Sequence, residues 1–460
     1  MRCRGLGFLT LGLLAAGILV AAPSAIVAQT NNNNTNNLAG VAVDAEGVLR
    51  LKTFNDASGQ VMGERIAAAR ASLDPRVASF SKLRKISLNR LEQAILDHQG
   101  TLTDEMRYLA GLLRVRYVFY YPESKDIVLA GPAEGWVPDM AGRIVGITSG
   151  RPAVQLQDLV VALRAFPPSG KTTPLIGCSI DPTQEGIAAL KQFEKSIRLN
   201  GPPSNDEVRM IAEGVRNSLG YQKISVNGVS PKTHFAQVMV EADYRMKLIG
   251  IGLEIPPVKM VSYIDHAKPS ESNGLRRWYF VPDYQCVRES EDGLAVELVG
   301  DGVKLVGEDE VVTGNGERKT AIGRGSKASK AFVTSFTRKY PELAARSPVY
   351  AELRNLIDLA VAAACVQQQG YYEKAGWNME FFGSEKEFPV ESYDIPKTVE
   401  AAVNVIARGH AFSFPVGGGV TIQPSEALES DHLLADKAGQ VSKLREGIKP
   451  NLAKGQWWWD

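Results

Sequence analysis

The stretch of sequence that decides the fold class is residues 175–226, LIGCSIDPTQEGIAALKQFEKSIRLNGPPSNDEVRMIAEGVRNSLGYQKISV. Apolar and β-branched runs at its two ends predict strands over 175–180 and 223–226. Between them, apolar side chains recur at the spacing of an amphipathic helix, first at Ile187, Leu190, Phe193 and Ile197 and then at Val208, Ile211, Val215 and Leu219.

The helix starts in this region carry recognisable capping residues. Asp181 is predicted as an N-cap because a proline follows it at the first helical position. Ser204 with Glu207 predicts a capping box. A third helix is predicted from Ser230 to Gly250. Alternating strands and helices of this kind favour an α+β fold in which helices cover a small sheet. The pattern does not distinguish parallel from antiparallel strands.

Similar patterns extend toward the N-terminus. Residues 38–51 alternate apolar and polar side chains around a glycine-containing turn, which predicts a hairpin. Helical spacing follows over 61–73 and 88–98, and β-rich runs follow over 115–121 and 127–130. This part is predicted to be an α+β unit.

After the proline pair 256–257 the pattern changes to β. Strands are predicted over 277–281, 294–299 and 303–306, with the glycines of 300–302 forming a tight turn between the last two. Helical spacing then returns in the C-terminal part.

The expected architecture is therefore α+β and multidomain, with mixed helix and sheet layers, central β-hairpins and a mainly helical C-terminal part. The predicted segments are a signal peptide at 1–28, an Asn-rich linker at 29–37, an N-terminal α+β unit at 38–136, a central strand and helix unit at 137–255, a β-hairpin region with a charged loop at 256–325, and a mainly helical region with a polar tail at 326–460.

The first 28 residues have the pattern of a secretory signal peptide. Arg2 and Arg4 precede an uncharged, Leu- and Ala-rich run that ends at Ala28. The alternative is that the run stays uncleaved as a membrane anchor. Either alternative predicts that the body of the protein is periplasmic or secreted, and apart from the signal peptide no transmembrane segment is expected.

Composition is that of a globular protein, with 460 residues, 44% of them hydrophobic and 22% charged. Removal of Arg2 and Arg4 with the leader changes the net charge from +1 to −1. A nearly neutral chain has no overall attraction to polyanions, so no nucleic-acid partner is expected.

Cysteine is scarce after the leader. Cys178, Cys286 and Cys365 remain, which excludes a disulfide scaffold. One bridge between Cys178 and Cys286 is an option, because Cys365 lies in an apolar stretch. The alternative is that all three are buried thiols.

Familiar catalytic and metal-binding motifs are incomplete. Gly170-Lys171-Thr172 matches the end of a phosphate loop, but Ala165 replaces its first glycine and two prolines remove backbone donors. The Ser79-x-x-Lys82 pair lacks its later partners. The histidines lie outside zinc-type spacing. We therefore expect no cofactor and no metal, and the balance of the motifs leans against an enzyme.

Two weaker groups of candidate residues remain. Arg277, Trp278 and Tyr284 combine aromatic rings with a cation, which suits recognition of a sugar or peptide, although a buried aromatic strand gives the same pattern. The carboxylates Asp243, Asp283 and Asp292 are candidate acid and base residues, provided that a cleft holds two of them about 5 to 9.5 Å apart.

Several segments together resemble a family of exported planctomycete proteins known as a domain of unknown function. The resemblance covers most of residues 40 to 365, and departures stand at Tyr279 and Val296, where tryptophan is expected. It implies export and a shared fold, and it transfers no catalytic residue. The segments that carry it are Val41 to Leu49, Cys178 to Thr183, Ala242 to Lys247, Trp278 to Tyr284 and Glu291 to Leu294.

Three functions are consistent with these observations. The first is a non-catalytic module of the bacterial envelope that binds an envelope protein or polymer. The second is a hydrolase that acts on an envelope polymer through paired carboxylates, and the third is a periplasmic binder of a small solute. A cleft with convergent carboxylates favours the hydrolase, whereas a closed polar pocket favours the solute binder.

Overall fold

The structure is a computed structural model, in which residues Thr35–Asp460 form a compact unit. It describes residues 38–53, 56, 58–198, 204–267, 274–312, 318–320, 326–408, 410–413, 416–448 and 450–460. The predicted signal peptide and Asn-rich linker lie outside these residues. Among the described helices, none has both the length and the apolar character needed to cross a membrane.

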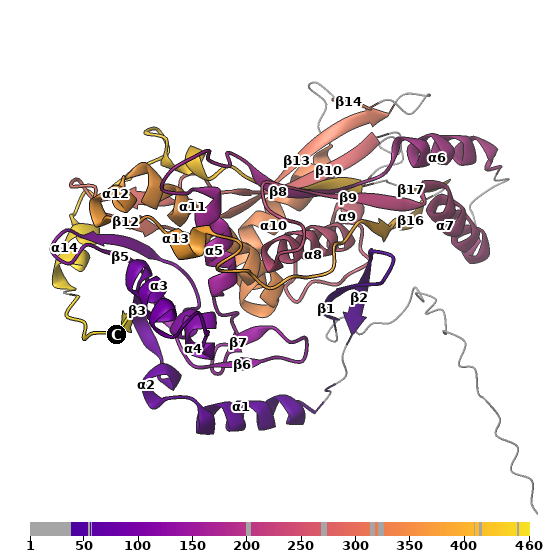
Figure 1. Ribbon diagram of the computed structural model, residues 1–460. Coiled ribbons are helices and arrows are strands. Elements are labelled where there is room, and N and C mark those ends of the chain that lie inside the picture. Colours follow the sequence, from indigo (N-terminus) through magenta and orange to yellow (C-terminus); the bar gives the residue numbers. More distant parts are fainter. Residues whose placement is uncertain are drawn as a thin grey trace, which may run out of the picture. The chain divides into compact units, whose positions relative to one another are not determined.

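The larger sheet has nine strands and combines segments from the whole chain (Figure 1). Most neighbours are antiparallel, but β18 runs parallel to β10, and β15 runs parallel to β2. In spatial order the strands are β1 (Leu38–Val43), β2 (Val48–Thr53), β15 (Thr398–Glu400), β9 (Tyr221–Asn227), β8 (Ile176–Asp181), β18 (Val416–Ile422), β10 (Gly274–Pro282), β13 (Val303–Val312) and β14 (Arg318–Thr320).

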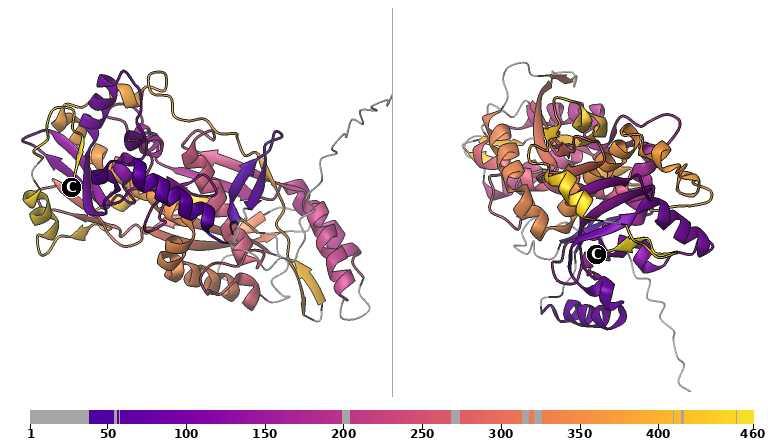
Figure 2. Two further views of the ribbon diagram at one scale, coloured as in Figure 1. Left: turned by 90° about the horizontal axis from the view of Figure 1, so that it is seen from below. Right: turned by 90° about the vertical axis from the view of Figure 1, so that its left-hand side faces the viewer.

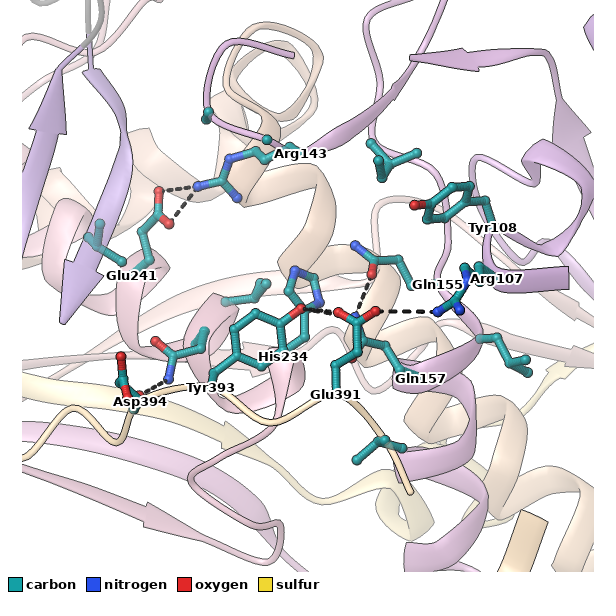
Figure 3. Close-up of a pocket in the computed structure, with 18 of the residues that line it drawn as sticks. Arg107, Tyr108, Arg143, Gln155, Gln157, His234, Glu241, Glu391, Tyr393 and Asp394 are labelled. Carbon is teal, nitrogen blue, oxygen red and sulfur yellow. Dashed lines mark hydrogen bonds and ion pairs between the residues drawn. The ribbon is translucent and has the colours of Figure 1, made fainter. Parts of the chain in front are cut away.

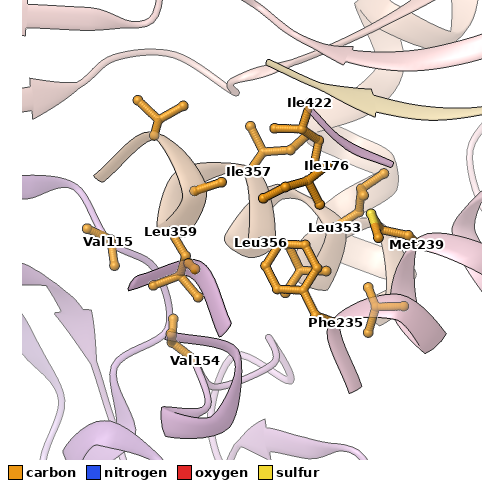
Figure 4. Close-up of a cluster of buried hydrophobic side chains, with 14 of the residues drawn as sticks. Val115, Val154, Ile176, Phe235, Met239, Leu353, Leu356, Ile357, Leu359 and Ile422 are labelled. Carbon is orange, nitrogen blue, oxygen red and sulfur yellow. The ribbon is translucent and has the colours of Figure 1, made fainter. Parts of the chain in front are cut away.

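Two helices that are buried almost all round form the centre of the molecule. Helix α8 (His234–Gly250) packs on β8 and β18, and α11 (Pro348–Gln368) packs on both α8 and α5 (Leu156–Ala165). Side chains from these elements and from the sheet meet in one apolar cluster that includes Ile176, Phe235, Met239, Leu356 and Ile422 (Figure 4). Burial of so much apolar surface is the main contribution to stability.

The second sheet has seven strands, and its strand β4 contacts α11. Helix α3 (Leu88–Asp97) packs on β5, and α14 (Gln440–Gly447) packs on β12. Its strands, in spatial order, are β19 (Leu434–Ala435), β11 (Val287–Glu289), β12 (Ala295–Leu298), β4 (Tyr117–Tyr121), β5 (Asp126–Ala133), β3 (Ser81–Ser87) and β20 (Trp458–Trp459).

The remaining elements surround these layers, and α1 (Gln60–Ser72) lies at the surface without a buried residue (Figure 2). They are α2 (Pro75–Ala78), α4 (Asp104–Arg107), η2 (Leu109–Gly111), β6 (Trp136–Pro138), β7 (Ile144–Gly146), α6 (Gln184–Ser196), α7 (Asn205–Leu219), α9 (Tyr263–His266), α10 (Lys327–Arg346), α12 (Tyr371–Ala375), α13 (Glu380–Gly383), β16 (Val405–Arg408), β17 (His410–Ser413) and η4 (Pro424–Leu428).

The predicted α+β class is confirmed, and so are most element positions. The N-terminal hairpin is β1–β2, and the capping box of Ser204 and Glu207 begins α7. Two helix starts were placed too early. Thr183, not Asp181, caps α6, because Asp181 is still paired with Lys223 in the sheet. Likewise α8 begins after Thr233, three residues beyond Ser230.

The predicted hairpin at 294–306 is wrong. Strand β12 pairs with β4 and β11 in the seven-stranded sheet, whereas β13 pairs with β10 and β14 in the nine-stranded sheet. The turn at Gly300–Gly302 therefore carries the chain from one sheet to the other. Asp301 lies within 3.8 Å of the Arg354 guanidinium of α11, which lies between the two sheets. The division into units at 136, 255 and 325 stays a prediction.

Candidate functional site: a polar pocket beside the N-terminal hairpin

A pocket of about 490 Å³ opens beside the β1–β2 hairpin, and we call it the hairpin pocket (Figure 3). One wall is the hairpin itself, and the opposite wall is made by the N-terminal ends of α5 and α8. Residues 388–394, which connect α13 to β15, close a third side. This volume is typical of pockets that hold small molecules.

His234 projects into the hairpin pocket from the first turn of α8. Its Nδ1 lies 2.8 Å from Asp158 Oδ2 on α5, and the ring stands 5.8 Å from that of Tyr393. Its Nε2 has no hydrogen-bond partner within the part of the chain that the structure describes, and the side chain is 15% exposed. A carboxylate on Nδ1 fixes the orientation of an imidazole, so the other ring nitrogen is presented to the pocket.

The pKa of the His234 imidazole is raised above its usual value. Burial alone lowers the pKa of the imidazole, but the Asp158 carboxylate outweighs burial, with a smaller contribution from Glu352, and raises that pKa to about 9. The ring is therefore cationic at neutral pH, and both nitrogens are donors.

This raised pKa predicts that stability depends on pH. Because the unfolded pKa is 6.5 and the folded pKa is about 9, the stabilisation is complete below the first value and is lost as pH rises through the second. We expect the free energy of unfolding to fall by up to about 3 kcal/mol across this window. Urea titrations at several pH values should show the fall in the wild type and a smaller one in His234→Gln, and equal slopes would contradict the assignment.

Buried charges form a connected network in and behind the wall of the pocket. Arg143, in the turn before β7, donates to both oxygens of Glu241, at 2.6 and 2.5 Å, and also to Glu352 of α11. Arg245, one turn beyond Glu241 on α8, pairs with Glu254 at 2.7 Å. The three carboxylates and Arg245 are buried. Such pairing is needed because an unpaired charge in the interior is strongly destabilising.

The segment that closes the pocket is held by main-chain hydrogen bonds. Arg164 of α5 donates to the carbonyls of Phe382, Ser384 and Phe388. Gln237 of α8 donates to the carbonyl of Asp394 at 2.8 Å. Side chains on α5 and α8 thus fix residues 382–394 over the pocket.

A metal is not indicated at this site. Among the described residues, the cluster with ligand-like spacing is Glu429, Asp431 and His432, none of which lines the pocket and which are exposed or half-buried. His432 Nδ1 there donates to the carbonyl of Glu426. Exposed acidic groups are common without an ion, so we assign no site.

The three candidate carboxylates each have a different cationic partner. Asp243 is fully buried on α8 and lies 2.7 Å from Lys247 Nζ, and burial raises the pKa of Asp243 to about 6. Asp283 lies 2.6 Å from Lys304 Nζ. Asp292 lies in the β11–β12 turn, 3.3 Å from Arg445. None of the three lines the hairpin pocket, and the structure does not bring them together.

The candidate aromatic patch is divided between two places. Trp278 is fully buried between Tyr263 and Phe332, and its indole donates to Ser329 Oγ at 3.0 Å. Arg277 of β10 pairs with Asp181 of β8, across the intervening strand β18. Tyr284 stacks on His432, 5.8 Å between ring centroids. The alternative of a buried aromatic strand therefore describes Trp278 correctly, and Trp278 is not a binding platform.

The cysteines are buried free thiols. Cys178 lies on β8 of the larger sheet, Cys286 lies beside β11 of the smaller one, and Cys365 lies on α11. The suggested bridge between Cys178 and Cys286 is not formed. Burial raises the pKa of all three thiols, to about 12 for Cys286 and Cys365, so they are unreactive.

The sequence reasoning did not find the residues of the hairpin pocket. In the sequence His234 is one of the histidines outside zinc-type spacing, and no motif singles out Asp158, Arg143, Glu241 or Glu352. The sequence does contain one signal of buried charges. Helices α8 and α11 are apolar enough to be buried, and yet both carry charged residues on their buried faces. Charges in such helices must find partners. The identity of the partners depends on tertiary contacts between distant segments.

Comparison with known proteins gives one match. A family model described as "Protein of unknown function (DUF1598)" matches residues 178–263. The matched segment runs from β8 to the start of α9 and supplies His234, Gln237 and Glu241 to the pocket. Neither the curated proteins nor the solved structures gave a match. A domain of unknown function is thus found within the region of the predicted resemblance, and planctomycete origin and export stay predictions.

Proposed function

We propose that the protein is a non-catalytic binding protein that holds a small polar solute in the hairpin pocket. The observation that carries the proposal is the imidazole of His234, which Asp158 orients and whose Nε2 is unpartnered in the pocket wall. Fixed, partly buried polar groups that converge on a concave site are the usual basis of small-molecule recognition.

The role of a binder agrees with the contents of the pocket. Serine, threonine and cysteine, the usual nucleophiles, are absent from the described lining residues. Two of the three carboxylates of the lining are paired, since Glu241 pairs with Arg143, and Glu391 accepts from Tyr393 and Arg107. The third, Asp394, is exposed to solvent. Hydrolysis through Asp243, Asp283 and Asp292 has no support. Each of the three carboxylates pairs with a different cation, and none of them lines the pocket.

We also propose that the protein acts in the bacterial envelope, where the leader pattern of residues 1–28 would direct it. The proposal of export is tested by fractionating cells and sequencing the mature N-terminus. An N-terminus after Ala28 in a periplasmic or secreted fraction supports it, and a full-length cytoplasmic chain contradicts it. An envelope protein or polymer as partner is a further proposal that rests on this location.

Filling the pocket should abolish binding without unfolding the protein. In Ala42→Trp a large ring is added from β1 into the pocket, whereas in Ala45→Trp the same ring is added at the exposed turn of the same hairpin. We expect native mass spectrometry with a polar metabolite library to detect a one-to-one complex in the wild type and in Ala45→Trp, and none in Ala42→Trp. Equal binding by both variants would contradict the proposed site.

A further inference from the structure

The charges of the hairpin pocket cancel within its own wall. His234 faces Asp158, Arg143 faces Glu241 and Glu352, and the nearest carboxylate to Arg107 in the lining is Glu391. Lys52 and Asp394 lie at the exposed rim, where water screens them. A charged ligand would therefore meet no uncompensated charge of opposite sign at the floor of the pocket, and this favours a neutral ligand.

The unused hydrogen-bonding capacity belongs mainly to neutral groups. Gln157 Nε2 donates to Gln155 Oε1 at 2.7 Å and to Tyr393 at 3.2 Å, while Gln157 Oε1 is buried without a partner. Across the pocket, Gln237 uses its amide nitrogen on the 388–394 segment. In the described part of the chain, Gln155 Nε2, Gln237 Oε1 and the hydroxyl of Tyr108 have no hydrogen-bond partner.

Gln155, Gln237 and Tyr108 line the same pocket and so offer it both donors and acceptors. An amide presents one acceptor oxygen and one donor nitrogen in a plane, and a hydroxyl of the solute can form a hydrogen bond with either of them. Aromatic rings of Tyr108, Tyr393 and Phe388 supply apolar surface beside them. The combination matches a molecule that has several adjacent hydroxyls and an apolar ring face.

We propose that the solute is a neutral sugar, bound by the amides of Gln155 and Gln237, by the Tyr108 hydroxyl and by the imidazole of His234. This inference rests on the proposed function, since it names the class of solute that the same pocket holds.

The test is calorimetric titration of the full chain with matched pairs of probes. Glucose, N-acetylglucosamine, maltose and cellobiose are the neutral probes, and glucuronate and glucosamine are their charged counterparts. We expect at least one neutral sugar to bind with one-to-one stoichiometry and its charged counterpart to bind about tenfold more weakly or worse, because the added charge finds no partner. Tighter binding of a charged counterpart would overturn the assignment of a neutral sugar.

Two substitutions test the amides. Gln155→Leu should weaken sugar binding by about tenfold or more, since a hydrogen-bonding group of the sugar is left unpaired. Gln157→Leu should weaken it as well, because Gln157 Nε2 donates to Gln155 Oε1 at 2.7 Å and so orients the Gln155 amide. Gln93→Leu is the control, because Gln93 is exposed on α3 and bonds only to Asp97. Unchanged affinity in both pocket variants, each checked for native thermal unfolding, would overturn the proposed contacts.

A pH series separates a hydroxyl from a carboxylate as the partner of His234. The charged and titratable groups around this ring are Asp158 on α5, Glu352 on α11, Arg143 before β7, and Tyr393. When the imidazole loses its proton near pH 9, a sugar hydroxyl can turn from acceptor to donor, whereas a carboxylate cannot. Affinity for the neutral sugar should change less than about threefold between pH 7 and pH 10. A tenfold or larger loss would contradict the hydroxyl contact.

Failure of this inference is distinguishable from failure of the proposed function. If amino acids or carboxylates bind and Ala42→Trp abolishes that binding, the pocket binds a solute but the sugar class is wrong. If neither the sugars nor the metabolite library gives a complex that Ala42→Trp removes, both proposals are wrong.

Discussion

Replacing Gly418 by alanine is expected to lower the free energy of unfolding by about 4 kcal/mol or more. Gly418 lies on β18 in the middle of the nine-stranded sheet, where a Cβ atom would stand 1.9 Å from the carbonyl oxygen and 2.6 Å from the amide nitrogen of Trp278. Both contacts are with backbone, which a rotamer change cannot relieve. The φ of +120° adds strain for any residue with a side chain.

The matched control for this prediction is Gly63→Ala. Gly63 lies within α1, where a Cβ would meet nothing within 4 Å. Alanine there should leave stability unchanged or raise it by up to about 1 kcal/mol through helix propensity. Urea denaturation of the two variants beside the wild type gives the comparison. A loss below about 1 kcal/mol in Gly418→Ala would contradict the close approach of β18 to β10.

The same glycines explain why β18 was not predicted. Residues 412–424 are rich in glycine and proline, and because glycine is depleted in strands the sequence does not predict a strand there. In the structure, Gly417, Gly418 and Gly419 let β18 lie against β8 and β10, whose Asp181, Trp278 and Cys178 occupy the space of a Cβ. Local propensity is overruled there by a tertiary contact more than a hundred residues away in the sequence.

Local signals, by contrast, were reliable where the structure depends on neighbouring residues. The capping box at Ser204 follows from hydrogen bonds within one helical turn. Helix α8 ends at Gly250 as predicted, although the left-handed glycine that follows it is Gly252, at φ +71°. The path of residues 294–306 depends on which sheet each strand joins, and a short glycine turn does not reveal this. The hairpin pocket was hidden for the same reason, because His234 and Asp158 are 76 residues apart.

Replacing Arg143 by methionine is expected to cost about 3 to 5 kcal/mol of unfolding free energy. The guanidinium compensates two buried carboxylates, Glu241 and Glu352, and methionine keeps most of the aliphatic volume without the charge. Arg245 still neutralises part of Glu241, at 3.4 Å, so Glu352 carries most of the loss. Burial already raises the pKa of Glu352, and without Arg143 that pKa should rise further.

Two further variants separate loss of the ion pair from loss of packing. Arg151→Met is the control, because Arg151 is exposed shortly after β7 and forms no ion pair in the described part of the chain. Adding Glu352→Gln to Arg143→Met should recover part of the stability, since it removes the uncompensated charge. The measurement is chemical denaturation of the wild type, Arg143→Met, Arg151→Met and the double variant. Equal losses of unfolding free energy in Arg143→Met and in the double variant would mean that lost packing alone is responsible.

The destabilisation by Arg143→Met should also depend on pH in a defined direction. An uncompensated buried carboxylate becomes neutral by taking up a proton, so the loss should shrink as pH falls toward 5 and grow as pH rises. The pocket variant Gln157→Leu removes no charge and should show no such dependence. Burying such a network costs desolvation free energy. Here its ion pairs connect three elements at the wall of the hairpin pocket, namely α8, α11 and the turn that precedes β7. Loss of solute binding in Arg143→Met under conditions where the protein is still folded would therefore connect the buried charges to the geometry of the pocket.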